Sequence, residues 1–493
     1  MAHRVSSKAV TFRQFAYNEE YFMRITRRRT RRAGAVIGVC ALALAGLAAP
    51  AEAAPGPRVR VEVPGPVGGM AGSGYRDVPR SFPRTPGAAP KALAGAADGQ
   101  VTKVIDNGDT KDRLDIVVIG DGYTADQLDQ FHTDAKEKWN DFLGVEPYRT
   151  YQKLFNVWTV DAVSAESGVS GDPGKDVTRN TALGAHFWCD DTERLLCVDQ
   201  QKVDAYVAKA PQADLVLVLA NSSKYGGAGY NEASPTLGYD GIATAAAHNQ
   251  ASSQVAVHET GHSLGKLADE YSYPGVPGYE QYTGPEKPEA NSSVLTADAM
   301  ASARTKWYRW LGAASPDGGT VGAYEGGNYF VKGLYRPTDD SLMRTLGKPF
   351  NLPGAEAMIA GFYRHATPAA PADRAQAWHT TARLALPRAP DAAHGGVTVR
   401  WYLDGAELRR FRDRDRVPMR GLALGRGAHR LTADVTDGTS AVRDPALRTR
   451  LTGSTGWTVQ HGSGSAADRS APVVAKPDAA PSPAPGGAVA AAG

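Results

Sequence analysis

The chain has 493 residues and a formal net charge of +3, with 42% hydrophobic and 22% charged residues. This composition is that of a soluble globular protein that can bury a sizeable core, and the length predicts two or three domains plus extensions. Much of the positive excess lies in RITRRRTRR, from Arg24 to Arg32, ahead of any expected fold. The charge therefore gives no sign of a nucleic-acid-binding surface.

Residues 1–53 are expected to be a secretory signal peptide. The basic run is followed by an apolar segment, 33–49, and by Ala51-Glu52-Ala53, which has the small-x-small form that signal peptidases cut after. A membrane anchor is the alternative, but the segment is shorter than the ~20 residues that a span usually needs. Met23 is a second candidate start, and Arg31-Arg32 leaves twin-arginine export open. We expect a secreted, extracellular protein.

Residues 54–98 are rich in Pro, Gly, Ala and Arg and hold few large apolar side chains. Such a segment cannot bury enough surface to offset the entropy of ordering it. We expect a flexible leader, which is either a propeptide or a plain linker. Because it contains no cysteine, a cysteine-based block of a metal site is excluded.

Cysteine usage agrees with export. Of three cysteines, Cys40 leaves with the signal peptide, whereas Cys189 and Cys197 stay in the mature chain. An even pair, close in sequence and in an oxidising compartment, favours one disulfide that closes a small loop. A metal-binding pair is the alternative, but the spacing is not that of a zinc knuckle.

A catalytic domain of α+β or mixed α/β class is expected over residues 99–366. Apolar runs predict strands at 114–119, 154–164 and 213–222, and Thr124 caps a helix that carries its apolar residues on one face. Helical patterns follow at 296–312 and 352–366. Beyond a Pro/Ala linker the period changes to two, which predicts a small all-β, immunoglobulin-like sandwich over 373–460. Residues 461–493 are expected to be a disordered tail.

The segment VAVHETGHSLGKLADEYSYPG, which runs from Val255 to Gly275, carries the strongest chemical signal. On a helix, His258 and His262 stand one turn apart on the same face, so both imidazoles can reach one metal ion. Glu259 is displaced by about 100° around the axis and can contact a water on the metal without binding the metal. In this H-E-x-x-H arrangement zinc acidifies the water and the glutamate takes its proton.

A third ligand is expected just after this helix. Gly265 stands where the metzincin pattern has the glycine that turns the chain sharply. The usual ligand position, three residues beyond that glycine, is Ala268, which cannot bind a metal. Asp269 and Glu270 are the nearest oxygen donors, and zinc accepts both. Met343, in SLMRT, is the candidate for the methionine turn expected beneath the metal.

With these motifs the chain resembles the secreted IgA-peptidase family of zinc metallopeptidases. The resemblance rests on HETGHSLGKLADEY, LDIVVIGDGYTADQLDQF, EGGNYFVKGLYRPTDDSLMR and the β-rich WYLDG…TADVTDGTSAVRD, and it spans residues 114–459. It implies one catalytic zinc ion as cofactor, with Asp269 as the third zinc ligand and Glu259 as the base. Glu270 remains the alternative ligand.

Other polar residues are weaker candidates. Tyr271 and Tyr335 are candidates for oxyanion or substrate contacts, with ordinary packing as the alternative for each. His186, beside Cys189, is the one further histidine to check as a ligand. His248 and the remaining histidines are expected to be exposed or hydrogen-bonded.

We therefore expect a secreted zinc endopeptidase in which a zinc-bound water is activated by Glu259. The alternative is a secreted binding or adhesion protein with a structural zinc domain, which would need four protein ligands where only three are visible. The expected partner is a protein or peptide substrate, with no nucleic acid and no membrane anchor after signal cleavage, and the chain is expected to be a monomer. Substrate specificity lies in subsites that motifs do not report.

The substrate is expected to add itself to a sheet edge formed by LVLVLANSSKYGGAGYN. An extended peptide can satisfy the free N–H and C=O groups of such an edge. Leu215 to Ala220 is predicted to be a buried strand, and Gly226, Gly227 and Gly229 would leave the backbone beyond it uncovered. A plain glycine turn is the alternative.

Overall fold

The structure is a computed structural model, and it describes residues 56–66, 73–82, 98–372, 380–388, 395–420, 422–461 and 473–477. The expected signal peptide, Met23 and the arginine pair lie outside these residues. So does most of the expected C-terminal tail, although Val473–Pro477 forms a strand.

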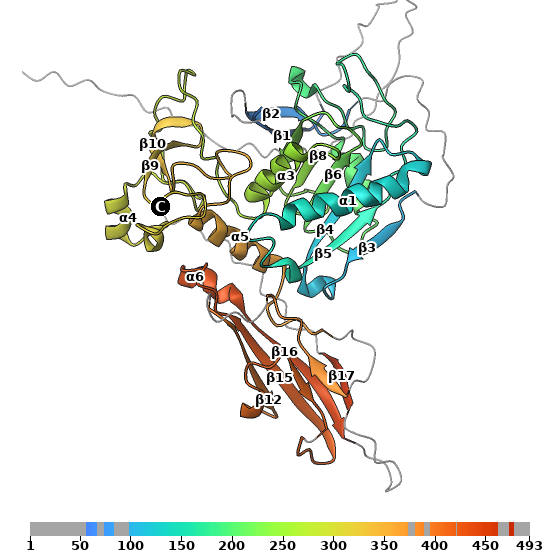
Figure 1. Cartoon of the computed structure of the whole chain (residues 1–493), viewed down its shortest axis with the longest axis vertical. Helices are drawn as coiled ribbons and strands as arrows, with labels where there is room; N and C mark the ends of the chain where they lie inside the picture. The colour runs from blue at the N-terminus through green and yellow to red at the C-terminus, as the bar shows by residue number, and fades with distance from the viewer. Residues whose placement is uncertain are drawn as a thin grey trace, which may run out of the picture. The chain divides into compact units, whose positions relative to one another are not determined.

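A mixed eight-stranded sheet forms the centre of the peptidase part (Figure 1). Its strand order is β2-β1-β7-β8-β6-β4-β5-β3. The neighbours β5, β4, β6 and β8 are parallel, whereas β7, β1, β2 and β3 pair antiparallel. The strands are β1 (Arg58–Val63), β2 (Gly74–Pro79), β3 (Val101–Ile105), β4 (Leu114–Asp121), β5 (Phe155–Val160), β6 (Leu215–Ala220), β7 (Gly227–Tyr230) and β8 (Ile242–Ala246).

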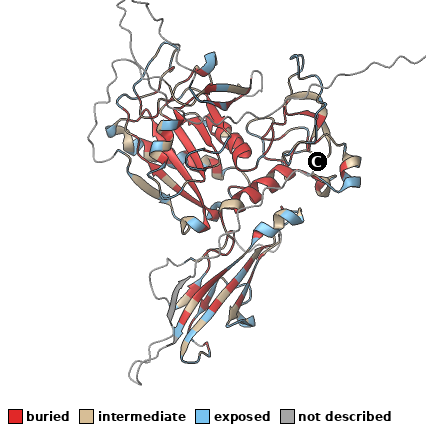
Figure 2. Ribbon diagram, turned by 180° about the vertical axis from the view of Figure 1, so that it is seen from behind, coloured by how far each residue is buried: buried red, intermediate tan, exposed pale blue. Residues whose placement is uncertain are grey.

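Apolar side chains on both faces of this sheet explain its two layers. Along β4, Leu114, Ile116 and Val118 join one hydrophobic cluster, while Val117 and Ile119 join another on the opposite face. The first cluster is covered by α1 (Leu128–Leu143), α3 (Gln250–Ser263) and α5 (Leu352–His365), and the second by α2 (Gln200–Val207). Figure 2 shows that the central strands and α3 are buried.

The expected flexible leader is partly ordered. β1 and β2 form an antiparallel hairpin that extends the sheet beyond β7. The reason is a period-2 pattern in RVRVEV: Val59, Val61 and Val63 are buried in the second cluster, whereas Arg58 and Arg60 are exposed. Composition hid this short apolar stripe, so the expectation of flexibility is wrong for these two strands.

The expected open edge is also placed differently. β6 lies inside the sheet, between β8 and β4. Strand β8 was not predicted from the sequence, because its segment IATAA is rich in alanine. The glycine segment forms β7, which pairs with β8 on one side and with β1 on the other. A residue pair between Glu62 and Gly229 joins β1 to β7.

The remaining described elements follow the sheet in sequence. Between α3 and α5 lie α4 (Ala297–Ala303), β9 (Tyr324–Gly327) and β10 (Phe330–Arg336). The C-terminal region is β-rich, with a two-stranded sheet and a five-stranded antiparallel sheet that share one apolar core. Its elements are β11 (Thr381–Arg383), β12 (Val397–Leu403), β13 (Ala406–Glu407), β14 (Arg416–Pro418), β15 (Gly427–Asp437), α6 (Pro445–Arg448), β16 (Thr452–His461) and β17 (Val473–Pro477). None of the helices in the described part of the chain has the length and apolar character that a bilayer span requires.

Candidate metal centre and active site

Helix α3 presents the two histidines of the H-E-x-x-H motif to one point. The Asn249 side chain caps the start of this helix by accepting a hydrogen bond from the Ser252 N–H. The Nε2 atoms of His258 and His262 lie 3.2 Å apart. Each Nδ1 stands within hydrogen-bond distance of a backbone carbonyl, 3.0 Å from Leu342 O and 2.6 Å from Leu267 O. A carbonyl only accepts, so Nδ1 carries the proton and Nε2 is left with a free lone pair.

Two carboxylates complete a buried cluster around these nitrogens. Oδ1 of Asp269 lies 3.2 Å from Nε2 of His258 and 3.3 Å from Nε2 of His262. Glu62, from strand β1, places Oε1 3.4 Å from His258 Nε2 and Oε2 2.9 Å from His262 Nε2. All four side chains are buried, and their ligand atoms lie within 4.8 Å of one another.

The cluster fits a zinc ion. Ligand atoms at zinc bond lengths of about 2.0–2.1 Å in a tetrahedron stand about 3.3 Å apart, which is close to the separations of the histidine and aspartate atoms. Oδ1 of Asp269 is buried and accepts no hydrogen bond. A buried carboxylate oxygen without a donor is costly, and a cation at this point satisfies it.

The chain returns Asp269 to the histidines by a turn directly after α3. The left-handed residue of this turn is Lys266, with φ 51°, and not Gly265 as the pattern suggested. Gly265 is needed for space, because a Cβ there would lie 2.7 Å from Gly261 O and 2.8 Å from Met358 Sδ. The Tyr329 hydroxyl donates to Oδ2 of Asp269, so that Oδ1 faces the histidines.

Glu270 points away from the metal cluster. Its Oε1 accepts hydrogen bonds from Asn291 and Asn351, at 2.8 and 2.9 Å. Its Oε2 accepts from the Ser341 hydroxyl at 2.7 Å and from Asn351 at 3.1 Å. These partners satisfy the buried carboxylate and tie the end of the motif to the Ser341 turn.

Met343, the predicted methionine of the turn, packs against α3 at Gly261. The backbone turns tightly there, because the N–H groups of Arg344 and Thr345 both donate to Ser341 O. Met343 is buried, and its Sδ would lie 2.6 Å from a Cβ on Gly261 of α3. The methionine therefore packs against the helix between the two histidines.

Glu259 is held beside the cluster but outside the four ligand atoms. Asn231 donates to Oε2 of Glu259 at 3.0 Å and to Oε2 of Glu62 at 3.2 Å, so one amide positions both carboxylates. Oε1 of Glu259 is buried and makes no hydrogen bond. Burial raises the pKa of Glu259 to about 8, and the nearby charge of Glu62 adds to the rise.

The predicted substrate-contacting residues have different places. Tyr271 is in the site, and its hydroxyl lies 3.2 Å from Oε1 of Glu62. Tyr335 belongs to β10, where its backbone pairs with Ser293 and its ring packs on the cluster around Trp307, so it is not part of the site. Gly227 has no free backbone: its N–H donates to Arg194 O and its C=O accepts from Leu196, both at 3.1 Å.

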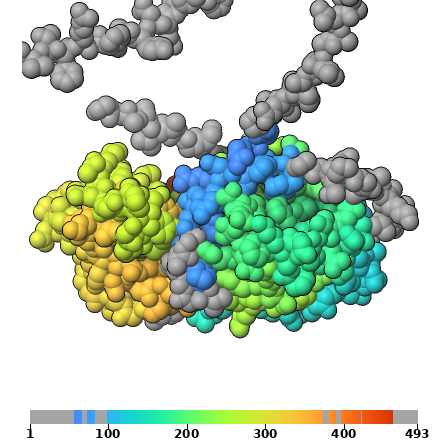
Figure 3. Space-filling model, turned by 90° about the horizontal axis from the view of Figure 1, so that it is seen from above, coloured from blue at the N-terminus to red at the C-terminus, as the bar shows by residue number. Residues whose placement is uncertain are grey.

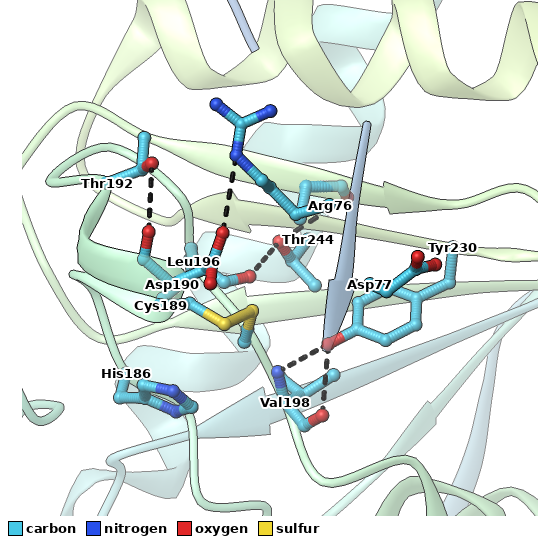
Figure 4. Close-up of a disulfide and its surroundings, with 12 residues drawn as sticks. Arg76, Asp77, His186, Cys189, Asp190, Thr192, Leu196, Val198, Tyr230 and Thr244 are labelled. Atoms are coloured by element: carbon cyan, nitrogen blue, oxygen red, sulfur yellow. Dashed lines mark hydrogen bonds and ion pairs between the residues drawn. A yellow bond between two sulfur atoms is a disulfide. The ribbon is translucent and has the colours of Figure 1, made fainter. Parts of the chain in front are cut away.

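Cys189 and Cys197 form the predicted disulfide (Figure 4). His186 lies near both sulfur atoms, but those sulfurs are bonded to each other and are not thiolate ligands. Next to the disulfide, Asp190 forms a 3.3 Å ion pair with Arg76 of β2. The disulfide loop is thereby joined to the β1–β2 hairpin.

Sequence reasoning missed three residues of the site. Glu62 lies 196 residues before His258. The only local signal for a role was that an acidic residue stands at Glu62, where the alternation of RVRVEV would continue the exposed arginines. Asn231 and Tyr329 lie in GYNE and EGGNYF, where neither has a spacing that signals a role. All three approach the metal cluster from other elements of the fold.

Two histidines one helical turn apart, an adjacent glutamate and a returning aspartate are the arrangement of metal-dependent hydrolases. The chain belongs to the IgA peptidase M64 family, whose family model matches residues 102–317 and 311–362, just over half of the 493 residues. It is therefore a metallopeptidase that acts on protein or peptide substrates, and the expected family is confirmed. No curated protein matches the chain.

Proposed function

We propose that the protein is a secreted zinc endopeptidase in which His258, His262 and Asp269 hold one zinc ion and Glu259 is the general base. The observation that carries this proposal is the distance set of 3.2, 3.2 and 3.3 Å among the two Nε2 atoms and Oδ1 of Asp269. Glu270 is left out of the ligand set because four hydrogen bonds already satisfy its carboxylate.

Bound zinc would supply the acidity of the attacking water and the polarisation of the scissile carbonyl. Glu259 takes the proton of that water on Oε1, which has no other partner in the structure. Asn231 holds Oε2 and thereby fixes the direction of the carboxylate. Glu259 then gives the proton to the leaving amine, so the same carboxylate serves first as general base and then as general acid.

The finer parts of the proposal rest on separate observations. A metzincin type of site is supported by Met343, which packs beneath the histidines, and by the aspartate that follows α3. Export is supported by the Cys189–Cys197 disulfide, because disulfides persist in oxidising compartments. The shared core of the two C-terminal sheets supports a small β-sandwich after the peptidase domain.

Replacement Glu259→Gln tests the mechanism. It keeps the size of the side chain and its contact with Asn231 but removes the base, so we expect bound zinc to persist while cleavage of casein falls by about three orders of magnitude or more. The assay must use whichever form of the chain shows turnover. Substantial cleavage by a zinc-loaded Glu259→Gln protein would refute the role of Glu259.

We propose a general protein substrate rather than an antibody, since the described site shows nothing specific to one hinge sequence. Digestion of a peptide library, with mass-spectrometric mapping of the cut sites, measures the preference directly. Selective cleavage of an immunoglobulin A hinge with nothing else cut would contradict this part of the proposal.

A further inference from the structure

Strand β1 lies where an extended substrate would add itself to the sheet. Glu62 pairs with Gly229 of β7, which would be the edge strand of the sheet without the β1–β2 hairpin, and Gly229 lies against Glu259. Strand addition to such an edge is a common way for peptidases and binding domains to hold extended peptides. In the space-filling view the blue N-terminal segment fills the space between the green and yellow parts of the chain (Figure 3).

The same strand brings a carboxylate into the metal cluster. Glu62 is 1% exposed, although Arg58 and Arg60, which precede it on the same face of β1, are exposed. Its Oε1 is within reach of His258 Nε2 and Tyr271, and its Oε2 is within reach of His262 Nε2 and Asn231. With Glu62 the cluster has four protein ligands, which closes the position that a catalytic zinc site keeps for water.

The hairpin is anchored on both sides of Glu62. Three valines of β1 are buried in the core beneath the sheet. On β2, Arg76 pairs with Asp190 beside the disulfide (Figure 4), and just after β2 Arg80 donates to Gln200 at 3.0 Å. The Tyr273 hydroxyl donates to Ser73 O just before β2. Glu62 is therefore held in the cluster by contacts that do not depend on the metal.

The hairpin lies before the residues that the family model matches. It is also continuous with the rest of the chain through residues 83–97 alone, so a single cut there would separate it covalently from the catalytic part. A strand that is tethered in this way has an effective concentration in the millimolar range. A free protein substrate at micromolar concentration that binds the edge with a similar intrinsic affinity is therefore outcompeted.

We infer that the β1–β2 hairpin is an autoinhibitory propeptide that occupies the substrate edge at Gly229 and closes the metal site with the carboxylate of Glu62. This inference rests on the proposed function, because it assigns the regulation of the same site. Under this inference the enzyme stays inactive until the hairpin dissociates. A substrate would then take the place of β1 and pair with β7.

Two readouts on the full-length chain test the inference. The first is zinc affinity, measured by competition with a chelator, for the wild type, Glu62→Gln and the control Arg58→Gln. Arg58 lies on the same strand but not in the metal cluster. We expect Glu62→Gln to lower zinc affinity by about tenfold or more, as changes to groups around a zinc site do, and Arg58→Gln to leave it unchanged.

The second readout is casein cleavage before and after the hairpin is cut off. A recognition sequence for a specific protease, placed between residues 82 and 98, is cleaved only after the whole chain has folded. We expect the uncut wild type to be at least about tenfold less active than uncut Glu62→Gln, because only the wild type has the carboxylate that fills the fourth position at the metal. Cutting ends the covalent tether of the hairpin, so it should raise casein cleavage by the wild type to a rate similar to that of uncut Glu62→Gln.

The outcomes separate the two proposals. If the uncut wild type cleaves casein as fast as the cut chain, the hairpin is not inhibitory, although the proposed function stands. If Glu62→Gln lowers zinc affinity but neither it nor cutting brings activity, Glu62 is a permanent ligand of a structural site, which overturns both proposals. If Glu62→Gln binds zinc as tightly as the wild type, Glu62 is not a ligand and the inference fails.

Discussion

Gly229 and Glu259 leave no room between them for a methyl group: a Cβ on Gly229 would lie 1.8 Å from Oε2 of Glu259. Because Gly229 is not in the left-handed region, space and not backbone conformation requires glycine there. We expect Gly229→Ala to displace the Glu259 carboxylate and to lower peptidase activity by about 100-fold or more, the cost of a misplacement near 1 Å. Zinc content should be unchanged, because Glu259 is outside the ligand set.

This prediction is measured in the Glu62→Gln background, so that closure of the metal site by the Glu62 carboxylate does not mask the effect. Gly319→Ala is the matched control, since a Cβ there would have no neighbour closer than 3.5 Å. Casein cleavage and zinc content of the two alanine variants are compared side by side. Equal activity of both variants would show that the contact between Gly229 and Glu259 does not position the base.

Asp269 and Glu270 are neighbours with different surroundings. We therefore expect replacement of Asp269 to weaken zinc binding and replacement of Glu270 to lower stability. Oδ1 of Asp269 accepts no hydrogen bond, whereas the Glu270 carboxylate accepts four. We expect Asp269→Asn to weaken zinc binding by about 100-fold, at the upper end of what changes around a zinc site produce, with little change in the stability of the zinc-free protein. Glu270→Gln should retain zinc more tightly than Asp269→Asn but lower the free energy of unfolding by about 1–3 kcal/mol, because it disturbs a buried hydrogen-bond network.

Zinc affinity by chelator competition and urea unfolding in the presence of the chelator distinguish the two effects. The chelator removes the contribution of metal binding to stability, which would otherwise hide the difference. Should Glu270→Gln lose zinc as readily as Asp269→Asn does, the assignment of the third ligand to Asp269 would have to be abandoned.

The metal centre was predictable where its geometry is local in the sequence. The spacing of His258, Glu259 and His262 fixes their relation as soon as the segment is helical. Asp269 follows His262 by seven residues, and the family resemblance selected it over Glu270. Met343 was found because its motif accompanies such helices. The disulfide was predictable for a similar reason, because two cysteines with a short separation have few other partners.

The rest depended on contacts between segments far apart in the sequence. Glu62 meets His258 across 196 residues, and Pro/Gly-rich composition outweighed the three valines of its strand. β8 was missed because Ile242–Ala246 is mostly alanine and has little strand propensity. Without β8 the order of the sheet could not be derived, so the predicted substrate edge included β6, which lies inside the sheet, together with the glycine segment that forms β7.

The surroundings of His365, at the end of α5, lead us to expect that the folded protein loses stability above neutral pH. Its Nδ1 lies 3.2 Å from Asp214 and its Nε2 3.0 Å from Asp240. Burial alone would lower the pKa of His365, but the hydrogen bonds to these two carboxylates raise it to about 9. Arg364 and Lys266 also contact Asp240, so the carboxylate stays charged and the imidazolium remains paired.

Because the folded-state pKa lies above the unfolded value of about 6.5, the folded protein holds this proton more tightly. The resulting stability is fully present below pH 6.5 and is lost as the pH rises to about 9. We expect the free energy of unfolding, from urea titrations between pH 6 and about 9.5, to fall by up to about 3 kcal/mol through this group. His365→Gln has no proton to release, so its stability should change less over the same range. Parallel curves for the wild type and His365→Gln would show that another group carries the pH dependence.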